Sequence, residues 1–160
     1  MCEESVGPVI TYGAGQQFQG IYEFAHKNGY MVGDSLCFSR HIYNKNVILS
    51  LTFSQALGGA CPTVGASGGY ITGGGHSLLS PSYGLGVDNA MQMKVVLPNG
   101  THITSNRCQN QDIFFALRGG GGATFGVVTE TTVRVFPEVP LQVSECAYPQ
   151  YSIQSSNVDD

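Results

Sequence analysis

The sequence has few charged residues and no cluster of basic ones. Charged residues make up 11% of the 160 residues, with seven Lys and Arg, eleven Asp and Glu, and a net charge of −4. The usual charged share is about 25%. Because no basic stripe is present, the composition excludes nucleic-acid binding driven by electrostatics. The hydrophobic share of 42% is ordinary for a globular protein and excludes a charge-rich disordered chain.

The sequence also has no long apolar run and no paired cysteine motif. Its longest dense apolar run, residues 47–53, is far shorter than the roughly 20 residues of a membrane-spanning helix. The first five residues are acidic and do not resemble a signal peptide, and the compartment stays open. Five widely spaced cysteines without a C-x-x-C pair argue against a disulfide scaffold or a zinc ribbon. Cys37 and His41 have no second ligand pair, so we predict no metal site.

Glycine is the residue in excess. The chain has 22 glycines in 160 residues, about twice the usual share of about 7%. Eight lie between residues 58 and 75, and four are consecutive at 119–122. The first group is mixed with packing residues such as Cys61, Tyr70 and Ile71, not with the serine and charge of a flexible linker. Two interpretations stay open: a cradle in which backbone contacts a ligand, and a tightly wound structural loop.

The first elements expected are a strand at residues 9–12 and a helix at residues 16–28. The helix is amphipathic, because Phe18, Ile21, Tyr22 and Ala25 recur at i, i+3, i+4 and i+7. Gly29 is placed to end it in the left-handed conformation. A short strand follows at residues 30–32, and a helical turn is expected between residues 77 and 83.

The second half predicts a hairpin, a helix and a final strand. Residues 90–97 alternate apolar with mostly polar side chains, which predicts a strand. Pro98-Asn99-Gly100 predicts a type I′ turn, after which residues 101–104 form the partner strand of the hairpin. Asn110 or Asp112 is expected to cap a helix at residues 113–117, which the four glycines end. In the last strand, residues 127–136, Val133 and Val135 face one side and Thr132 and Arg134 the other. These elements indicate an α+β fold with an antiparallel-rich sheet.

Three short motifs carry weak signals. Residues 65–69 fit G-x-S-x-G, a hydrolase nucleophile elbow around Ser67, but the only Asp and His in the required order are Asp88 and His102. Residues 13–18 begin like a dinucleotide fingerprint and fail at the third glycine. Asn99-Gly100-Thr101 is an N-glycosylation sequon whose simpler meaning is the hairpin turn.

A longer pattern is much more specific. Residues 58–77, GGACPTVGASGGYITGGGHS, resemble the flavin-contacting segment of the vanillyl-alcohol-oxidase (VAO) type FAD-linked oxidases. These share the FAD-binding domain named after p-cresol methylhydroxylase (PCMH), and the berberine-bridge-enzyme-like (BBE-like) branch with its fungal relatives is the most similar. Residues 12–15, 83–89, 112–122 and 125–129 fit the same family in the same order.

The resemblance implies a function and a set of cofactor contacts. The fold would be the second subdomain of a PCMH-type FAD-binding domain, an antiparallel-rich sheet flanked by helices, present incompletely. The complete relative would pass a hydride from a small-molecule alcohol, amine or activated C–H bond to FAD, which O2 reoxidises. Cys61 matches the position that forms a thioether to the flavin in bicovalent members, and His76 could contact the flavin or satisfy a backbone carbonyl. The contacts implied are Cys61, Pro62, Thr63, Val64, Gly65, Gly68, Gly69, Gly74 and His76 at the flavin, and Gly126, Val127 and Val128 toward the adenine or ribose.

Departures from the family pattern set further expectations. Residues 1–8 are expected to be a non-native or disordered start, 9–138 the partial FAD-binding domain, and 139–160 a truncated start of the substrate domain or a disordered tail. Residues 33–57 interrupt the family pattern and are expected to be a retained intron or a surface loop. The chain has no recognisable catalytic base, so the resemblance implies an FAD-dependent oxidoreductase of which this chain alone is expected to be inactive. Full-length relatives are often secreted. Two alternative functions remain: a remnant that does not hold FAD, and a serine hydrolase acting through Ser67.

Overall fold

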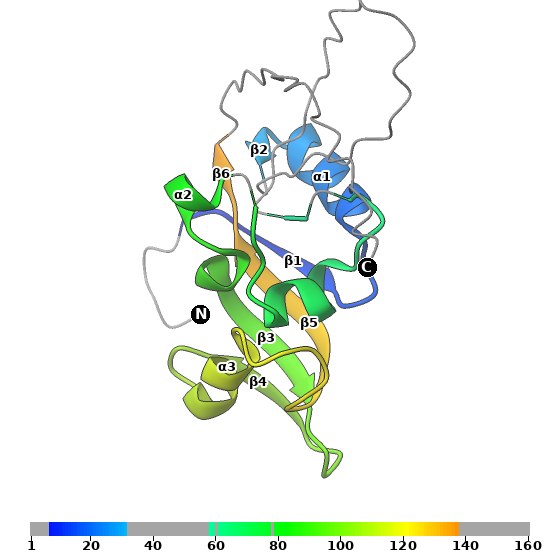
Figure 1. Ribbon diagram of the computed structural model, residues 1–160, viewed down its shortest axis with the longest axis vertical. Helices are drawn as coiled ribbons and strands as arrows, with labels where there is room; N and C mark the ends of the chain where they lie inside the picture. Colours follow the sequence, from blue (N-terminus) through cyan, green and yellow to red (C-terminus); the bar gives the residue numbers. More distant parts are fainter. Residues whose placement is uncertain (1–6, 32–57, 60, 78, 138–160) are drawn as a thin grey trace, which may run out of the picture.

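The computed structural model describes residues 7–31, 58–59, 61–77 and 79–137 (Figure 1). Most of the expectations for residues 1–8, 33–57 and 139–160 lie outside the described residues. The strands are β1 (Val9–Gly13), β2 (Tyr30–Met31), β3 (Ala90–Val96), β4 (His102–Asn106), β5 (Val127–Arg134) and β6 (Phe136–Pro137). The helical segments are α1 (Phe18–Lys27), η1 (Ala66–Ile71), α2 (Ser80–Tyr83), η2 (Gly86–Asn89) and α3 (Gln111–Leu117).

Four of the strands form one antiparallel sheet in the order β1-β5-β3-β4, and β2 pairs with β6 in a second, two-stranded sheet. The register places Thr131 of β5 between Tyr12 of β1 and Met93 of β3. The carbonyl of Pro8 accepts a hydrogen bond from the Val135 amide, 3.0 Å away. The α+β class and the antiparallel-rich sheet predicted from the sequence are therefore confirmed.

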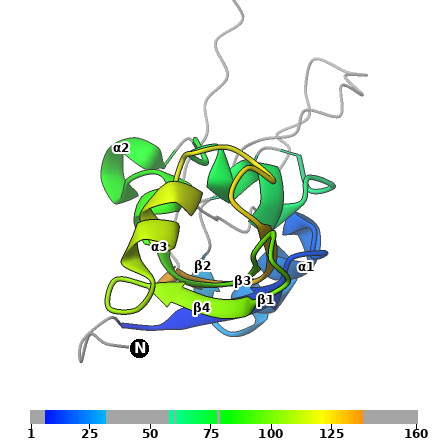
Figure 2. The ribbon, with the colours of Figure 1, turned by 90° about the horizontal axis from the view of Figure 1, so that it is seen from below.

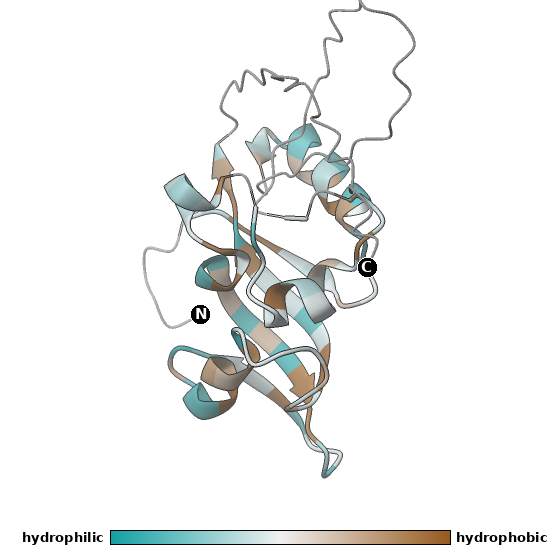
Figure 3. Ribbon diagram, viewed as in Figure 1, coloured by the Kyte–Doolittle hydropathy of each residue, from teal (hydrophilic) through white to brown (hydrophobic). Residues whose placement is uncertain are grey.

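The two faces of the sheet differ in character. One face is apolar, with Ile10, Tyr12, Met93, Val95 and Val133 all buried, and β3 and β5 carry alternating apolar and polar residues (Figure 3). Figure 2 shows α3 and the glycine-rich residues on the same side of this sheet. The predicted inward direction of Val133 is confirmed, because a strand alternates its side chains between faces.

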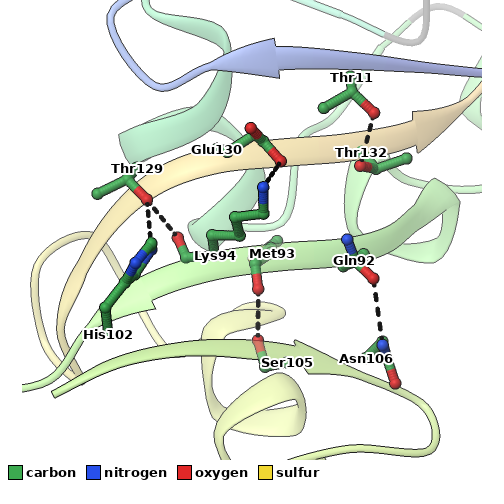
Figure 4. A network of polar contacts seen from close by, with 10 residues as sticks. All are labelled: Thr11, Gln92, Met93, Lys94, His102, Ser105, Asn106, Thr129, Glu130 and Thr132. Atoms are coloured by element: carbon green, nitrogen blue, oxygen red, sulfur yellow. Dashed lines mark hydrogen bonds and ion pairs between the residues drawn. The ribbon is translucent and has the colours of Figure 1, made fainter. Parts of the chain in front are cut away.

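The other face carries a network of polar pairs across the strands (Figure 4). Lys94 Nζ lies 2.8 Å from Glu130 Oε1, and Asn106 Nδ2 donates to Gln92 Oε1 at 3.2 Å. The hydroxyls of Thr11 and Thr132 hydrogen-bond at 2.8 Å. Thr132 points away from the core as predicted but is also buried, at a position paired with Thr11 on β1 and with Gln92 on β3.

The apolar face predicted for helix α1 is the face that the helix buries. Phe18, Ile21, Tyr22 and Ala25 are its buried residues, as the spacing predicted. The chain leaves the helix through Asn28, whose Nδ2 donates to the carbonyl of Phe24 at 2.7 Å. Gly29 then adopts a φ of +74°, which confirms its predicted left-handed conformation.

The β3–β4 hairpin forms, but its predicted type I′ turn is wrong. A type I′ turn needs positive φ at both Asn99 and Gly100, and only Gly100 has one, at +82°. The turn instead starts at Leu97, whose carbonyl accepts the Gly100 amide at 2.9 Å, so Pro98 and Asn99 are the central residues. The reason is Pro98, whose ring fixes φ near −65° and favours the first central position of a type I turn.

The predicted side-chain cap of α3 is also wrong, because no side-chain hydrogen bond caps this helix. Asn110 stands at the N-cap position, but it has a φ of +49° and makes no side-chain cap bond. Its Nδ2 donates instead to the carbonyl of Thr104 at 2.7 Å. Asp112 lies within the first turn, where its negative charge suits the helix dipole, and does not cap.

Candidate functional site

The glycine-rich segment, residues 58–77, begins its described course against the start of α1. That helix has no side-chain cap, and its first two amides need acceptors. The carbonyl of Val64 accepts the Phe18 amide at 3.1 Å, and the carbonyl of Pro62 accepts the Gln19 amide at 2.9 Å. The Ala66 amide donates to the carbonyl of Gln16 at 3.0 Å. The backbone of the segment thus caps α1, and α1 in turn fixes the path of the segment.

A cluster of three aromatic rings lies beneath this contact. Phe18 stacks on Tyr22 with ring centroids 5.3 Å apart and meets Tyr70 edge-on at 4.8 Å. Tyr22 Oη donates to the carbonyl of Gly59 at 2.8 Å, and Tyr70 Oη donates to the carbonyl of His76 at 2.9 Å. Two tyrosine hydroxyls therefore hold the segment near its two ends, while the Phe18 ring lies against Gly59 at its start and against Tyr70.

Burial raises the pKa of Tyr70 above its ordinary value. Burial raises the pKa of Tyr12 as well, and repulsion from Tyr70 adds to that shift. Both phenols therefore remain protonated at neutral pH, and the Tyr70 hydroxyl stays a hydrogen-bond donor.

The segment next forms η1, which packs on β5. Ser67 is fully buried, and its hydroxyl bonds that of Thr131. The proposed partners for a serine nucleophile are engaged elsewhere: Asp88 accepts the Leu85 amide, and His102 Nε2 lies 3.3 Å from Thr129 Oγ1. The structure does not assemble a triad, and nothing in it supports the hydrolase alternative.

The two glycine groups of the sequence meet in space. The Gly121 amide donates to the carbonyl of Thr72 at 2.9 Å. A Cβ built on Gly122 would lie 3.5 Å from the Cα of Gly69. The second group therefore does more than end α3, because it also forms part of the wall against which η1 rests. The sequence had no signal for this contact, since the two groups are about 50 residues apart.

The glycines of the segment fall into two sets according to what surrounds them. One set is crowded by the chain itself. A Cβ on Gly73 would lie 2.7 Å from the carbonyl oxygen of Gly69, one on Gly75 2.9 Å from the Tyr70 ring, and one on Gly58 would overlap Phe18 and Tyr22. Gly59 also lies against Phe18 and Tyr70. Packing explains why these positions lack side chains.

The other set faces open space. No atom of the described residues lies within 4 Å of the position that a Cβ would take at Gly65, Gly68, Gly69 or Gly74. These four are the glycines that the resemblance implies as flavin contacts. Gly74 has a φ of +115° and Gly68 an unusual ψ of −105°, so backbone conformation alone explains glycine at these two.

Neither crowding by described neighbours nor an unusual backbone conformation explains the glycine at position 65. Its φ of −66° and ψ of 122° suit any residue, and its surroundings are open. It pairs with Gln17 in an isolated antiparallel bridge whose hydrogen bonds are made by the residues on either side. In such a pair the amide and carbonyl of the central residue point away from the partner strand. Gly65 therefore presents bare backbone and an outward amide, which fits the close approach of a flat ring.

The remaining predicted residues of the segment are accessible to differing degrees. Cys61 is a free cysteine of intermediate exposure, and its carbonyl accepts the Val64 amide at 3.1 Å. Thr63, Val64 and His76 are exposed. Among the described residues, His76 accepts a hydrogen bond through its backbone only, so its imidazole does not satisfy a carbonyl there. Contact of Cys61 and His76 with a ligand stays a prediction.

Gly126, Val127 and Val128 belong to a different part of the site prediction. Gly126 has a φ of +150°, and a Cβ on it would lie 2.7 Å from both Val95 Cγ1 and the carbonyl oxygen of Val96. Val127 and Val128 pair with Val96 and Val95 on β3. The fold alone therefore requires glycine at 126, and contact of these three residues with a cofactor stays a prediction.

Replacing Gly126 by alanine is expected to destabilise the fold by at least about 2 kcal/mol, because the added methyl meets backbone and the φ is unsuited to alanine. Urea unfolding followed by circular dichroism measures this. Gly20→Ala, at an exposed helical position beside only the flexible Gln16 side chain, is the matched control and should be neutral or stabilising. Equal stability of the two variants would contradict the crowding at Gly126.

Arg118 has structural contacts on the side of α3. Its Nε donates to the carbonyl of Val87 at 2.7 Å, and its guanidinium lies 5.2 Å from the centroid of the Phe114 ring. Its Nη2 lies 3.7 Å from Asp88 Oδ1, a loose and partly exposed ion pair. These contacts join α3 to η2.

The described residues also form a cavity outside the glycine-rich segment. A cavity of about 180 Å³ lies between the start of β1 and the end of α1, where Ile10, Phe24 and Tyr30 line it, away from the glycine-rich segment. Within the described ranges no group of three or more His, Cys, Asp or Glu side chains is placed to hold a metal ion. No helix among these residues is long and apolar enough to cross a membrane.

Comparison with known proteins gives consistent results. No family model matches the chain. The FAD-linked oxidoreductase ffsJ of Aspergillus flavipes is 42% identical over 156 residues, which are 98% of this chain and 22% of that protein. The FAD-linked oxidoreductase easE of Arthroderma benhamiae is 46% identical over 142 residues, 88% of this chain and 24% of that protein.

Solved structures show the same relationship. The VAO-type flavoprotein MtVAO615 from Myceliophthora thermophila superposes with a TM-score of 0.66 at 37% identity, over 82% of this chain and 20% of that one. The BBE-like 1 protein of Physcomitrella patens superposes with a TM-score of 0.62 at 30% identity, over 81% of this chain and 23% of that one.

The fold is thus that of part of a VAO-type flavoprotein. By sequence and by fold, the chain belongs to the family of FAD-linked oxidoreductases that contains the VAO-type and BBE-like enzymes, as the motifs predicted. It spans between about a fifth and a quarter of the length of these four relatives.

Proposed function

We propose that the glycine-rich segment binds the isoalloxazine ring of FAD and that the protein is a flavin-dependent oxidoreductase acting on a small-molecule alcohol, amine or activated C–H bond. FAD, when bound, supplies the hydride acceptor and the reaction with O2. The observation that carries the proposal is Gly65, which is open and outward-facing and lacks a side chain for no reason that the described residues supply. Gly69, also open, extends the same bare surface along η1.

The residues of the segment have distinct parts in this proposal. The carbonyls of Pro62 and Val64 are engaged by α1, which holds the backbone rigid before a ligand arrives. The outward amide of Gly65 is then fixed in place as a donor. A preorganised donor stabilises negative charge on a bound group without any cost of reorientation. The protonated Tyr70 keeps the far end of the segment in place through the His76 carbonyl.

Cys61 is proposed as the residue that links covalently to the flavin. It is a free, partly exposed cysteine at the start of the described course of the segment. Neighbouring Thr63 and Val64 are exposed beside it. No catalytic base is assigned among the described residues.

Expression of the full chain with excess FAD tests the proposal. We expect a yellow protein whose flavin fluorescence stays with the polypeptide on a denaturing gel. Cys61→Ala should lose this retained fluorescence but keep flavin that is released by denaturation, because only the covalent bond is removed. A folded, colourless product would favour the alternative in which this chain does not hold FAD. Retained fluorescence in Cys61→Ala would contradict the assignment of Cys61.

A further inference from the structure

The β3–β4 connection carries a motif that the flavin site does not use. Asn99, Gly100 and Thr101 form the only N-x-Ser/Thr sequon of the sequence. All three residues are exposed. The hairpin that they close extends to the end of the molecule opposite α1 (Figure 1). A large group attached there would meet no described part of the chain.

The conformation of the turn leaves the acceptor groups free. Asn99 Oδ1 accepts the Thr101 amide at 2.9 Å, which draws the side chain toward the threonine. Asn99 Nδ2 and the Thr101 hydroxyl have no partner among the described residues. Gly100, with its φ of +82°, has open space at its Cβ position and adds no bulk between the two.

A second observation concerns the redox environment of the chain. Cys108, two residues after the end of β4, is disulfide-bonded. Disulfides form and persist in oxidising compartments such as the endoplasmic reticulum and the extracellular space. Transfer of N-linked glycans also takes place in the endoplasmic reticulum. A disulfide at Cys108 therefore agrees with a compartment in which the sequon would be modified.

We propose that Asn99 is a site of N-glycosylation. In the transfer, a bond forms between Asn99 Nδ2 and C1 of the first sugar of a lipid-diphosphate-linked oligosaccharide, and the bond from C1 to the diphosphate oxygen breaks. The amide loses one proton, the lipid diphosphate is the leaving group, and nothing is oxidised or reduced. The glycan extends from the hairpin into solvent. This inference is independent of flavin binding.

Translation of the full chain behind a signal sequence with eukaryotic microsomes tests the proposal. A C-terminal tag with its own acceptor sequon reports translocation whether or not the chain folds. We expect two glycans, both removed by peptide N-glycosidase, which leaves aspartate at position 99. Asn99→Gln and Thr101→Ala should each carry one glycan, and Thr101→Ser should again carry two. One glycan on the unsubstituted chain, or two on Asn99→Gln, would overturn the assignment.

Discussion

Replacing Gly65 by alanine is expected to weaken FAD binding at least tenfold, or about 1.4 kcal/mol, while leaving the fold intact. The methyl group would stand in the space where the flavin is proposed to contact backbone, and an induced shift of the ligand would lengthen its bond to the Gly65 amide. The backbone itself tolerates alanine, with φ −66° and ψ 122°, and no atom of the part of the chain that the structure describes lies within 4 Å of the new Cβ. Such a substitution commonly stabilises a protein by about 0.4–1 kcal/mol through the unfolded state.

Two measurements separate these effects. Fluorescence titration gives the FAD dissociation constant, and a thermal melt without FAD gives the stability. Gly20→Ala is the matched control, which should leave the dissociation constant unchanged. A Gly65→Ala variant that binds FAD as tightly as the unsubstituted chain would contradict the proposed contact. Loss of stability in this variant would show instead that the chain's own packing requires glycine at position 65.

Replacing Phe18 by alanine is expected to destabilise the chain by about 3–5 kcal/mol, the usual cost of emptying a buried aromatic site. Phe18 is 1% exposed, stacks on Tyr22 and meets Tyr70 edge-on. A Cβ on Gly59 would lie 3.4 Å from the Phe18 ring, so the ring also supports the start of the glycine-rich segment. The fold and the candidate site should therefore weaken together.

Urea unfolding measures the change in stability, and an exposed phenylalanine provides the control. Phe115 is 82% exposed, and Phe115→Ala should change the free energy of unfolding by less than about 0.5 kcal/mol. Equal stability of Phe18→Ala and Phe115→Ala would show that the aromatic cluster does not support the segment. Partial loss of FAD binding in Phe18→Ala, measured below its unfolding transition, is also expected.

Much of the fold could be predicted because its signals are local. The four buried residues of α1 follow from helical spacing, and the inward residues of β3 follow from alternation. The glycine-rich segment was identified as the candidate site because its pattern of 20 residues is long and specific. Four of its glycines have open surroundings among the described residues, and their contact with flavin stays a proposal.

The features that could not be predicted depend either on neighbouring residues that favour different turns or on residues far away in the sequence. The hairpin turn began at Leu97, since Pro98 favoured one register over the one that Asn99 and Gly100 alone suggest. Asn110 bonded Thr104 of a preceding strand in place of its own helix. The sequence could not show which glycines are open and which are crowded, because that depends on where Phe18 and Tyr70 lie in space.

The most direct test of flavin binding by the glycine-rich segment is hydrogen exchange of the backbone amides with and without FAD. We predict that FAD slows exchange in residues 61–76, with Gly65 among the most affected, and leaves the exposed β3–β4 connection unchanged. Binding of FAD that protects other residues and spares this segment would contradict the proposal, and so would an unchanged pattern at saturating FAD.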